Sequence, residues 1–247
     1  MPIALVFALS ACGGGGGENT IIVTTAPPTT APERTALRVY FLRNDDVQPV
    51  ARGVEKTQAI AAAALEALFA GPASSERMDM RLRTEIPVDA AYSNLRIGSG
   101  TAHVDLSPDV SRAGLGQVVY TLTQFPTVTD VETGGKRYTR GDFEDEAPAI
   151  LVESPLPFSS VRSPLRARGT ANTFEATFEY DVVGPDGEVL AHDFVTATSG
   201  SGTRGTFEFT APFTVAASGE GKLIVFESSA KDGSRIHIVE IPLQLEQ

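Results

Sequence analysis

The chain has 247 residues, of which 42% are hydrophobic and 21% are charged, and 20 Lys and Arg against 31 Asp and Glu give a formal net charge of -11. A single cysteine excludes a disulfide-linked fold and a cysteine-rich metal fold, and the acidic balance argues against a nucleic-acid partner, which requires a basic face. No stretch reaches the roughly 18 consecutive apolar residues that a membrane-spanning helix needs.

The N-terminal residues are typical of an export signal. Residues 3–9 are apolar without a break, which indicates the hydrophobic region of a signal peptide and is too short to cross a bilayer. The segment that follows resembles the lipobox of bacterial lipoproteins, in which a peptidase removes the signal in front of a diacylated cysteine. The lipobox residues are Leu9, Ser10, Ala11 and Cys12.

This resemblance implies that residues 1–11 are a signal peptide and that Cys12 is an acylated N-terminus, anchored in the cell membrane on its extracytoplasmic face. Residues 12–36 are rich in Gly, Thr, Pro and Ala. Such a composition lacks the apolar surface that offsets the entropy of chain ordering, so we expect this segment to be a tether. One feature departs from the pattern: no Lys or Arg precedes the apolar run, where signal peptides carry positive charge.

Residues 37–147 predict an α+β domain. Two segments place apolar residues at the 3.6-residue spacing of a helix, and the others follow the pattern of strands. The expected order is β-α-β-β-α-β, with the helices on one face of the sheet. The elements are a strand at 37–42, a helix at 57–69, an extended segment at 84–88, a hairpin at 95–107, a helix at 115–125 and a strand from 128.

This order and four short sequence stretches resemble the GerMN domain, known from spore germination and from envelope lipoproteins of the LpqB type. The matching stretches are 68–72, 84–87, 104–107 and 117–124. The resemblance implies a module that assembles with other envelope proteins, and it implies no catalytic residues. The β-propeller that follows in LpqB proteins has no counterpart here, so their signalling partner is not transferred.

Residues 148–247 predict an all-β domain. Apolar and polar residues alternate from Phe174 to Val182, which is the two-residue period of a strand with one wet face. Turn sequences at 185–187 and 231–234 separate such segments. About seven short strands predict an antiparallel sandwich.

The second domain resembles the immunoglobulin-like domain of bacterial spore-germination proteins, of the Gmad type. The stretches that carry the resemblance are 161–164, 169–171 with 174–175, 205–207 and 226–234. The resemblance implies adhesion or scaffolding rather than chemistry.

Few residues suggest catalysis or metal binding. His103, His192 and His237 lie in predicted strands without metal-ligand spacing, so we expect no metal and no cofactor. His103 and Asp105 share a strand face, which leaves a Ser-His-Asp triad open, although no nucleophile-elbow motif accompanies it. The acidic run at 142–146 is interpreted as a solvated linker rather than a calcium site.

One local basic cluster is predicted to contact an anion or a partner. It consists of Arg77, Arg81 and Arg83, and the alternative is a solvated helix end or loop.

Together these features predict a non-catalytic lipoprotein of the cell envelope that binds envelope proteins or cell-wall components such as peptidoglycan. Two alternatives stay open: an envelope hydrolase with an unrecognised site, and a solute-binding lipoprotein.

Overall fold

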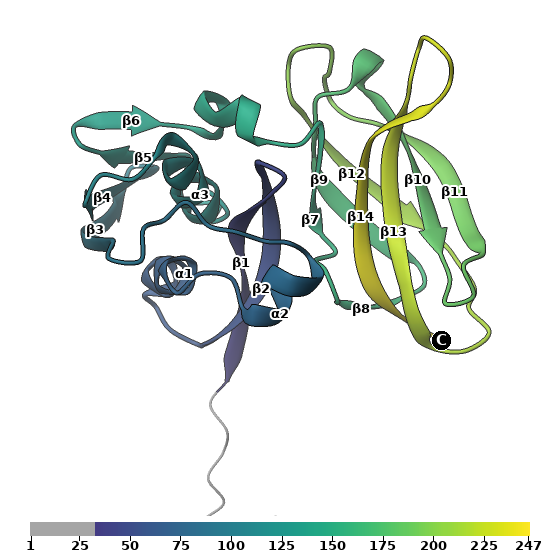
Figure 1. The fold of residues 1–247 in the computed structure, drawn as a ribbon, viewed down its shortest axis with the longest axis horizontal. Coiled ribbons are helices and arrows are strands. Elements are labelled where there is room, and N and C mark those ends of the chain that lie inside the picture. The colour runs from purple at the N-terminus through teal and green to yellow at the C-terminus, as the bar shows by residue number, and fades with distance from the viewer. Residues whose placement is uncertain (1–32) are drawn as a thin grey trace, which may run out of the picture. The chain divides into compact units, whose positions relative to one another are not determined.

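The computed structural model describes residues 33–247 (Figure 1). The predicted signal peptide, the lipobox residues Leu9, Ser10, Ala11 and Cys12, and the tether up to residue 32 lie outside the described residues. Within the described part of the chain, none of the helices is both long enough and apolar enough to cross a membrane.

The N-terminal region mixes helices and strands, which confirms the predicted fold class. Its elements are β1 (Arg34–Arg43), β2 (Asp46–Glu55), α1 (Ile60–Phe69), α2 (Ser74–Asp79), β3 (Ala91–Gly98), β4 (Thr101–Ser107), α3 (Arg112–Leu122), β5 (Asp130–Thr133) and β6 (Lys136–Tyr138). They form a two-stranded sheet, β1-β2, and a four-stranded sheet in the order β3-β4-β5-β6. The order therefore begins β-β-α-α rather than β-α.

The first strand continues into a hairpin that the sequence did not predict. β1 and β2 pair antiparallel from Arg34↔Glu55 to Arg43↔Asp46, and the turn residues Asn44 and Asp45 have φ values of 51° and 75°. Asn and Asp tolerate this left-handed conformation better than other residues with a side chain. The sequence analysis predicts the strand at 37–42 but not the strand that follows this turn.

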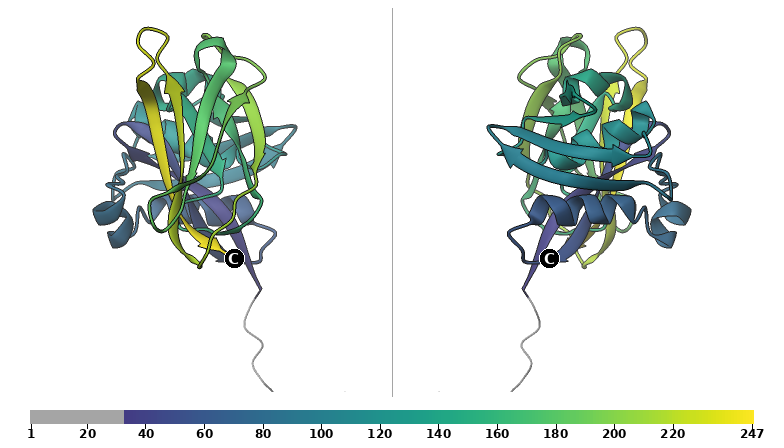
Figure 2. Two further views of the ribbon diagram at one scale, coloured as in Figure 1. Left: turned by 90° about the vertical axis from the view of Figure 1, so that its right-hand side faces the viewer. Right: turned by 90° about the vertical axis from the view of Figure 1, so that its left-hand side faces the viewer.

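Both longer helices pack against the hairpin. Figure 2 shows α1 crossing the β1–β2 ribbon, and the buried core contains side chains from β1, α1 and α3, including Tyr40, Leu65 and Val119. The predicted extended segment at 84–88 is not a strand. The structure records only an isolated bridge between Leu42 and Arg83 at this point.

The 3-10 helix η1 (Arg140–Glu146) leads into the C-terminal region, which contains only strands and one short 3-10 turn, η2 (Phe174–Ala176). The strands are β7 (Ile150–Ser154), β8 (Ser160–Arg162), β9 (Leu165–Ala171), β10 (Thr177–Val183), β11 (Val189–Thr196), β12 (Gly205–Ala211), β13 (Gly219–Ser228) and β14 (Arg235–Glu246). They form a five-stranded sheet, β11-β10-β13-β14-β8, and a three-stranded sheet, β12-β9-β7.

These two sheets share one core, as expected for a sandwich. Phe178 and Leu223 from the larger sheet and Phe207 from the smaller one belong to the same buried cluster. All strand pairs are antiparallel except β14 with β8, which is parallel. The predicted all-β sandwich is therefore confirmed.

Two details of β10 differ from its predicted alternation. The strand begins at Thr177, and Phe174 lies in the preceding turn with 58% of its surface exposed. Asp181, predicted on the wet face, is only 2% exposed. It accepts hydrogen bonds from His192 Nδ1 at 2.7 Å and Arg235 Nη1 at 2.8 Å, so neighbouring side chains cover it.

Candidate functional site: an arginine-lined cleft

The three arginines predicted as an anion contact have different surroundings. Arg83 forms ion pairs with Asp45 and Glu85, so its charge is compensated locally. Arg77 donates through Nη2 to Ser74 Oγ at 3.1 Å and through Nη1 to the Pro72 carbonyl. Arg81 is exposed. The anion contact at these residues stays a prediction.

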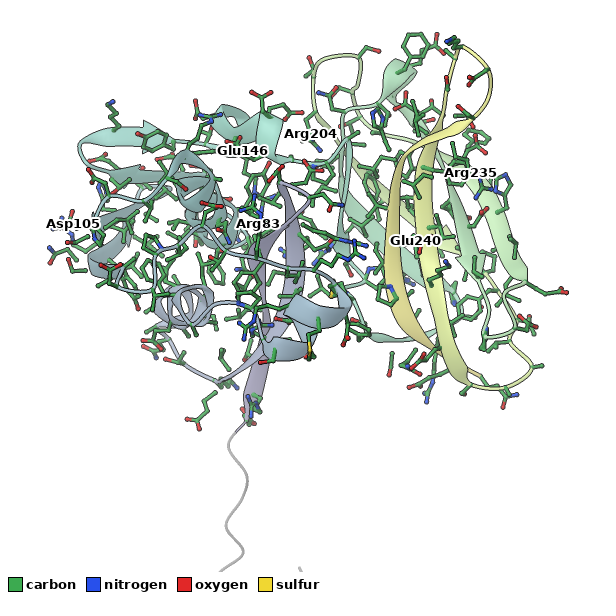
Figure 3. All side chains as sticks on the ribbon, viewed as in Figure 1. Arg83, Asp105, Glu146, Arg204, Arg235 and Glu240 are labelled. Atoms are coloured by element: carbon green, nitrogen blue, oxygen red, sulfur yellow. The ribbon has the colours of Figure 1, made fainter. Side chains whose placement is uncertain are left out.

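The histidines each face a carboxylate. His103 Nδ1 lies 3.4 Å from Glu132 Oε1, whereas Asp105 accepts a hydrogen bond from Asn94 Nδ2 at 2.7 Å. Within residues 33–247, no hydrogen bond joins His103 to Asp105 or to a serine. In Figure 3, the labelled Asp105 lies well apart from Arg83, which is a member of the predicted basic cluster. The same part of the chain has no group of three or more side chains arranged to hold a metal ion.

The acidic run at 142–146 is not the solvated linker that the sequence predicts. It forms most of η1, in which Phe143 is fully buried. Glu144 Oε2 lies 2.9 Å from Arg204 Nε, and Glu146 Oε1 lies 2.8 Å from Arg112 Nε. Glu144 and Glu146 thus form ion pairs that fix this connection, and Figure 3 labels Glu146 and Arg204.

A buried polar cluster joins β1, η1 and β7. Arg140 Nη1 donates to Glu153 Oε1 at 2.9 Å, and Arg140 Nε donates to Thr123 Oγ1 at 2.8 Å. The Tyr40 hydroxyl donates to the same carboxylate. Arg140 also lies over the Tyr120 ring, 4.7 Å from its centroid, which is a favourable cation–π distance.

Burial and charge shift the titration of this cluster. Burial raises the pKa of the Tyr40 hydroxyl above its ordinary value, and the Glu153 charge adds to that effect. Burial also raises the pKa of Tyr120 to about 12. Burial opposes ionisation of Glu153 as well, but the Arg140 charge and the Tyr40 hydrogen bond outweigh it and hold the pKa of Glu153 below its usual value. The carboxylate is therefore ionised and paired with arginine at neutral pH.

Beside this cluster lies a cleft of about 660 Å³, bounded by residues of β1, β7, β8 and β9 and by Gln124 and Phe125, which follow α3. Its charged lining residues are Arg38, Arg162, Arg166, Arg168 and Glu153. A second cleft of about 630 Å³ shares Arg38, Glu153 and Arg168 with the first. We call the larger one, with its four arginines, the arginine cleft.

The strand pattern of β9 explains two of these arginines. Leu165, Ala167 and Gly169 point into the sandwich core and are buried. Since successive side chains of a strand point to opposite faces, Arg166 and Arg168 project outward, and both are exposed.

Arg38 reaches the arginine cleft from β1. Its backbone N–H donates to Gln124 Oε1 at 2.7 Å, and Gln124 Nε2 donates back to the Arg38 carbonyl at 2.6 Å. The buried Nε of Arg38 has no hydrogen-bond partner among the residues that the structure describes. This N–H is therefore a shielded donor, and Arg38 Nη2 donates to the Gln124 carbonyl at 3.5 Å.

The sequence analysis missed this cleft, and its statement that residues 77–83 hold the one local basic cluster was wrong. Arg162, Arg166 and Arg168 lie within seven residues of one another in the sequence, which is a comparable local concentration of positive charge. The contribution of Arg38 had no sequence signal, because only the fold brings it to β9.

Comparisons with known proteins give matches for both regions. A family model described as sporulation and spore germination matches residues 38–132, and one described as the immunoglobulin-like domain of bacterial spore germination matches residues 149–234. These matches confirm the two resemblances drawn from the sequence. No curated protein gives a significant match to the chain.

Two solved structures are similar over part of the chain. The tandem GerMN domains of the sporulation protein GerM from Bacillus subtilis share 25% identity over 45% of this chain and 43% of that one, with a TM-score of 0.36. A Clostridium perfringens protein described as a candidate lipoprotein shares 17% identity over 46% of this chain and 95% of that one, with a TM-score of 0.30. The chain thus spans less than half of the GerM structure that it matches.

Proposed function

We propose that the chain is a non-catalytic, membrane-anchored lipoprotein of the cell envelope. Its role is to bind envelope proteins or cell-wall components. The proposal starts from the two matches, which give a sporulation- and germination-related GerMN domain at 38–132 and an immunoglobulin-like domain of bacterial spore germination at 149–234.

The observation that carries the proposal is the order of segments along the chain. Leu9, Ser10 and Ala11 precede Cys12, a tether follows, and the two domains come last. Each buried methylene of an acyl chain contributes about 0.8 kcal/mol, and two chains anchor stably where one is marginal. A diacylated Cys12 would therefore hold both domains at the outer face of the membrane.

Support for a binding role comes from the surroundings of the polar side chains. His192 Nδ1 lies 2.7 Å from Asp181 Oδ1 and His237 Nδ1 lies 2.9 Å from Glu227 Oε2, so carboxylates on the sandwich hold both imidazoles in place. The Arg140–Glu153 pair likewise connects strands and helices. Such networks position secondary structure, which suits a scaffold.

The anchor is tested by metabolic labelling with a fatty-acid analogue. The wild-type chain is expected to take up the label and to fractionate with membranes, and Cys12→Ala is expected to lose both properties. A Cys12→Ala variant that is labelled as strongly as the wild type would sink the lipoprotein assignment.

The binding role is tested by crosslinking in living cells. A photoreactive residue at exposed Arg166 is expected to capture an envelope component, whereas the same probe at exposed Gly98 serves as the comparison site. Hydrolysis of peptidoglycan or an ester that disappears in His103→Ala would instead favour the enzyme alternative.

A further inference from the structure

The arginine cleft has a charge opposite to that of the whole molecule. Four arginines line it against one glutamate, while the chain carries a formal net charge of -11. Because the remaining surface is on balance acidic, an anionic ligand is repelled elsewhere and attracted here.

The positive charge of the cleft is available to a ligand. Within residues 33–247, neither Arg166 nor Arg168 takes part in an ion pair, and both are exposed. Arg162 Nε lies 2.9 Å from Glu246 Oε2, so the charge of Arg162 is compensated locally and the free charge of the cleft comes mainly from Arg166 and Arg168. The single acid, Glu153, is already held by Arg140 and Tyr40, so it does not neutralise the cleft.

The chemistry of the lining favours phosphate groups. All four cations are guanidinium groups, whose planar forks bind phosphate through two parallel N–H donors. Arg166 and Arg168 are two residues apart on β9, so they project about 7 Å apart along the strand. Ser154, Ser159 and Ser160 add hydroxyl groups to the same lining. Guanidinium groups at this regular spacing suit a polymer that carries phosphate groups at regular intervals.

The position of β9 disfavours a peptide ligand. β9 is the middle strand of its sheet, paired with β12 on one side and β7 on the other. Its backbone groups are thus not free to add a peptide strand, which is the way an edge strand recognises a peptide. Recognition at Arg166 and Arg168 must come from side chains reaching the anionic groups of the ligand.

We propose that the arginine cleft binds a phosphodiester polymer of the envelope, with Arg166 and Arg168 contacting successive phosphate groups and Arg38 and Arg162 flanking them. This deepens the proposed function and rests on it, since it names the class of wall component that the anchored domains would hold.

The test is a binding titration of the purified full chain with a fluorescent poly(glycerol phosphate) of defined length. The double variant Arg166→Ala/Arg168→Ala is expected to bind about tenfold or more weakly, because charge-assisted hydrogen bonds are lost. The matched control is Arg96→Ala/Lys136→Ala, which removes the same charge from exposed positions in the N-terminal region and is expected to keep the wild-type affinity. Unfolding midpoints of both variants verify that the fold is retained, and Arg166→Ala alone serves as a milder second variant.

Three results would overturn the proposal. Equal losses in the two double variants would mean diffuse attraction rather than a site. Poly-L-glutamate bound as tightly as the phosphate polymer would assign the cleft to acidic polypeptides. Absence of binding by the wild-type chain would show that the arginine cleft is not a binding site for this polymer.

The titration is independent of the anchor. It uses purified protein, so a failed fatty-acid label would overturn the lipoprotein assignment and leave the affinity data intact. Conversely, a chain that is labelled and membrane-bound but does not bind the polymer would support the lipoprotein assignment and overturn the proposal for the arginine cleft.

Discussion

At the scale of single residues, Gly169 occupies the tightest position on β9. A Cβ atom there would lie 2.0 Å from the Leu151 carbonyl oxygen and 2.8 Å from the Phe207 ring. The Leu151 contact is backbone of the paired strand β7, so it cannot move aside without distorting the sheet.

We therefore expect Gly169→Ala to lower the free energy of unfolding by about 3 kcal/mol, the upper range for overpacking. Gly98→Ala is the matched control, because no atom lies within 4 Å of its Cβ position and the change should stay below about 1 kcal/mol. Urea unfolding measures both, and equal effects would contradict the packing argument.

Asp181 shows how a charged side chain can be buried on the outer face of a sheet. Its carboxylate accepts from His192 and Arg235, and the Arg235 guanidinium also lies 3.8 Å from the centroid of the Phe226 ring. If a neutral amide replaces the Asp181 carboxylate, the His192 and Arg235 donors face an amide oxygen, which is a weaker acceptor.

Asp181→Asn is accordingly expected to destabilise the protein by about 1–3 kcal/mol. Exposed Asp193 on the neighbouring strand provides the control, since Asp193→Asn should change stability by less than about 0.5 kcal/mol. Denaturant titration of the two variants decides, and a neutral Asp181→Asn would show that the cluster contributes nothing.

At the scale of elements, the spacing of apolar residues predicted the helices and strands that depend on the local sequence. The apolar stripe of α1, the hairpin of β3 and β4, and the sandwich strands follow from side-chain spacing alone. β2 was missed because Pro49 and Gly53 interrupt its apolar residues. Proline is tolerated there because the second edge of this two-stranded sheet is unpaired.

The candidate cleft was harder to predict, since it depends on contacts between elements far apart in sequence. Arg38 and Arg168 line the same cleft from β1 and β9, and no local pattern relates them. The burial of Asp181 likewise depends on Arg235, 54 residues away. Spacing within a strand gives the face of a side chain but not its tertiary partner.

The link between β1, η1 and β7 should make stability depend on pH. The pKa of Glu153 is lowered from its ordinary 4.5, so the folded state binds fewer protons than the unfolded state. Its contribution is complete above pH 4.5 and is lost as the pH falls through the lower, folded-state value.

In Glu153→Gln this contribution is absent at every pH. The difference in free energy of unfolding between wild type and variant should therefore shrink as the pH falls from about 6 to about 3. Glu208→Gln, at an exposed position on β12, should keep the wild-type slope. A constant difference across the range would mean that the Arg140–Glu153 pair does not couple to folding.

At the scale of the whole described chain, two hydrophobic cores are joined by polar contacts. One core includes Tyr40 and Leu65 and the other includes Phe178 and Leu223. Arg140 links β1 and α3 to β7 through Tyr40, Tyr120 and Glu153. Leu151 of β7 also packs in the first core, and we expect the polar contacts to be the main coupling between the two cores.

Arg204 provides a second link of the same kind. It lies 2.9 Å from Glu144 in η1 and donates through Nη2 to the Pro148 carbonyl at 2.9 Å. Arg140→Ala/Arg204→Ala removes both links while leaving each core intact. We expect the wild-type chain to unfold in a single calorimetric transition and this variant to unfold in two, because each core then melts independently.

The matched control removes ion pairs that each lie within one region. Arg137 pairs with Asp130 in the N-terminal region, and Lys222 pairs with Glu240 across β13 and β14. Arg137→Ala/Lys222→Ala should keep a single transition with a midpoint shifted by a few degrees, since exposed pairs contribute about 0–1 kcal/mol each. If Arg140→Ala/Arg204→Ala also gave one transition with equal calorimetric and van't Hoff enthalpies, the polar links would not be what couples the two cores. The packing of Leu151 in the first core and the backbone connection through η1 would then account for the cooperativity.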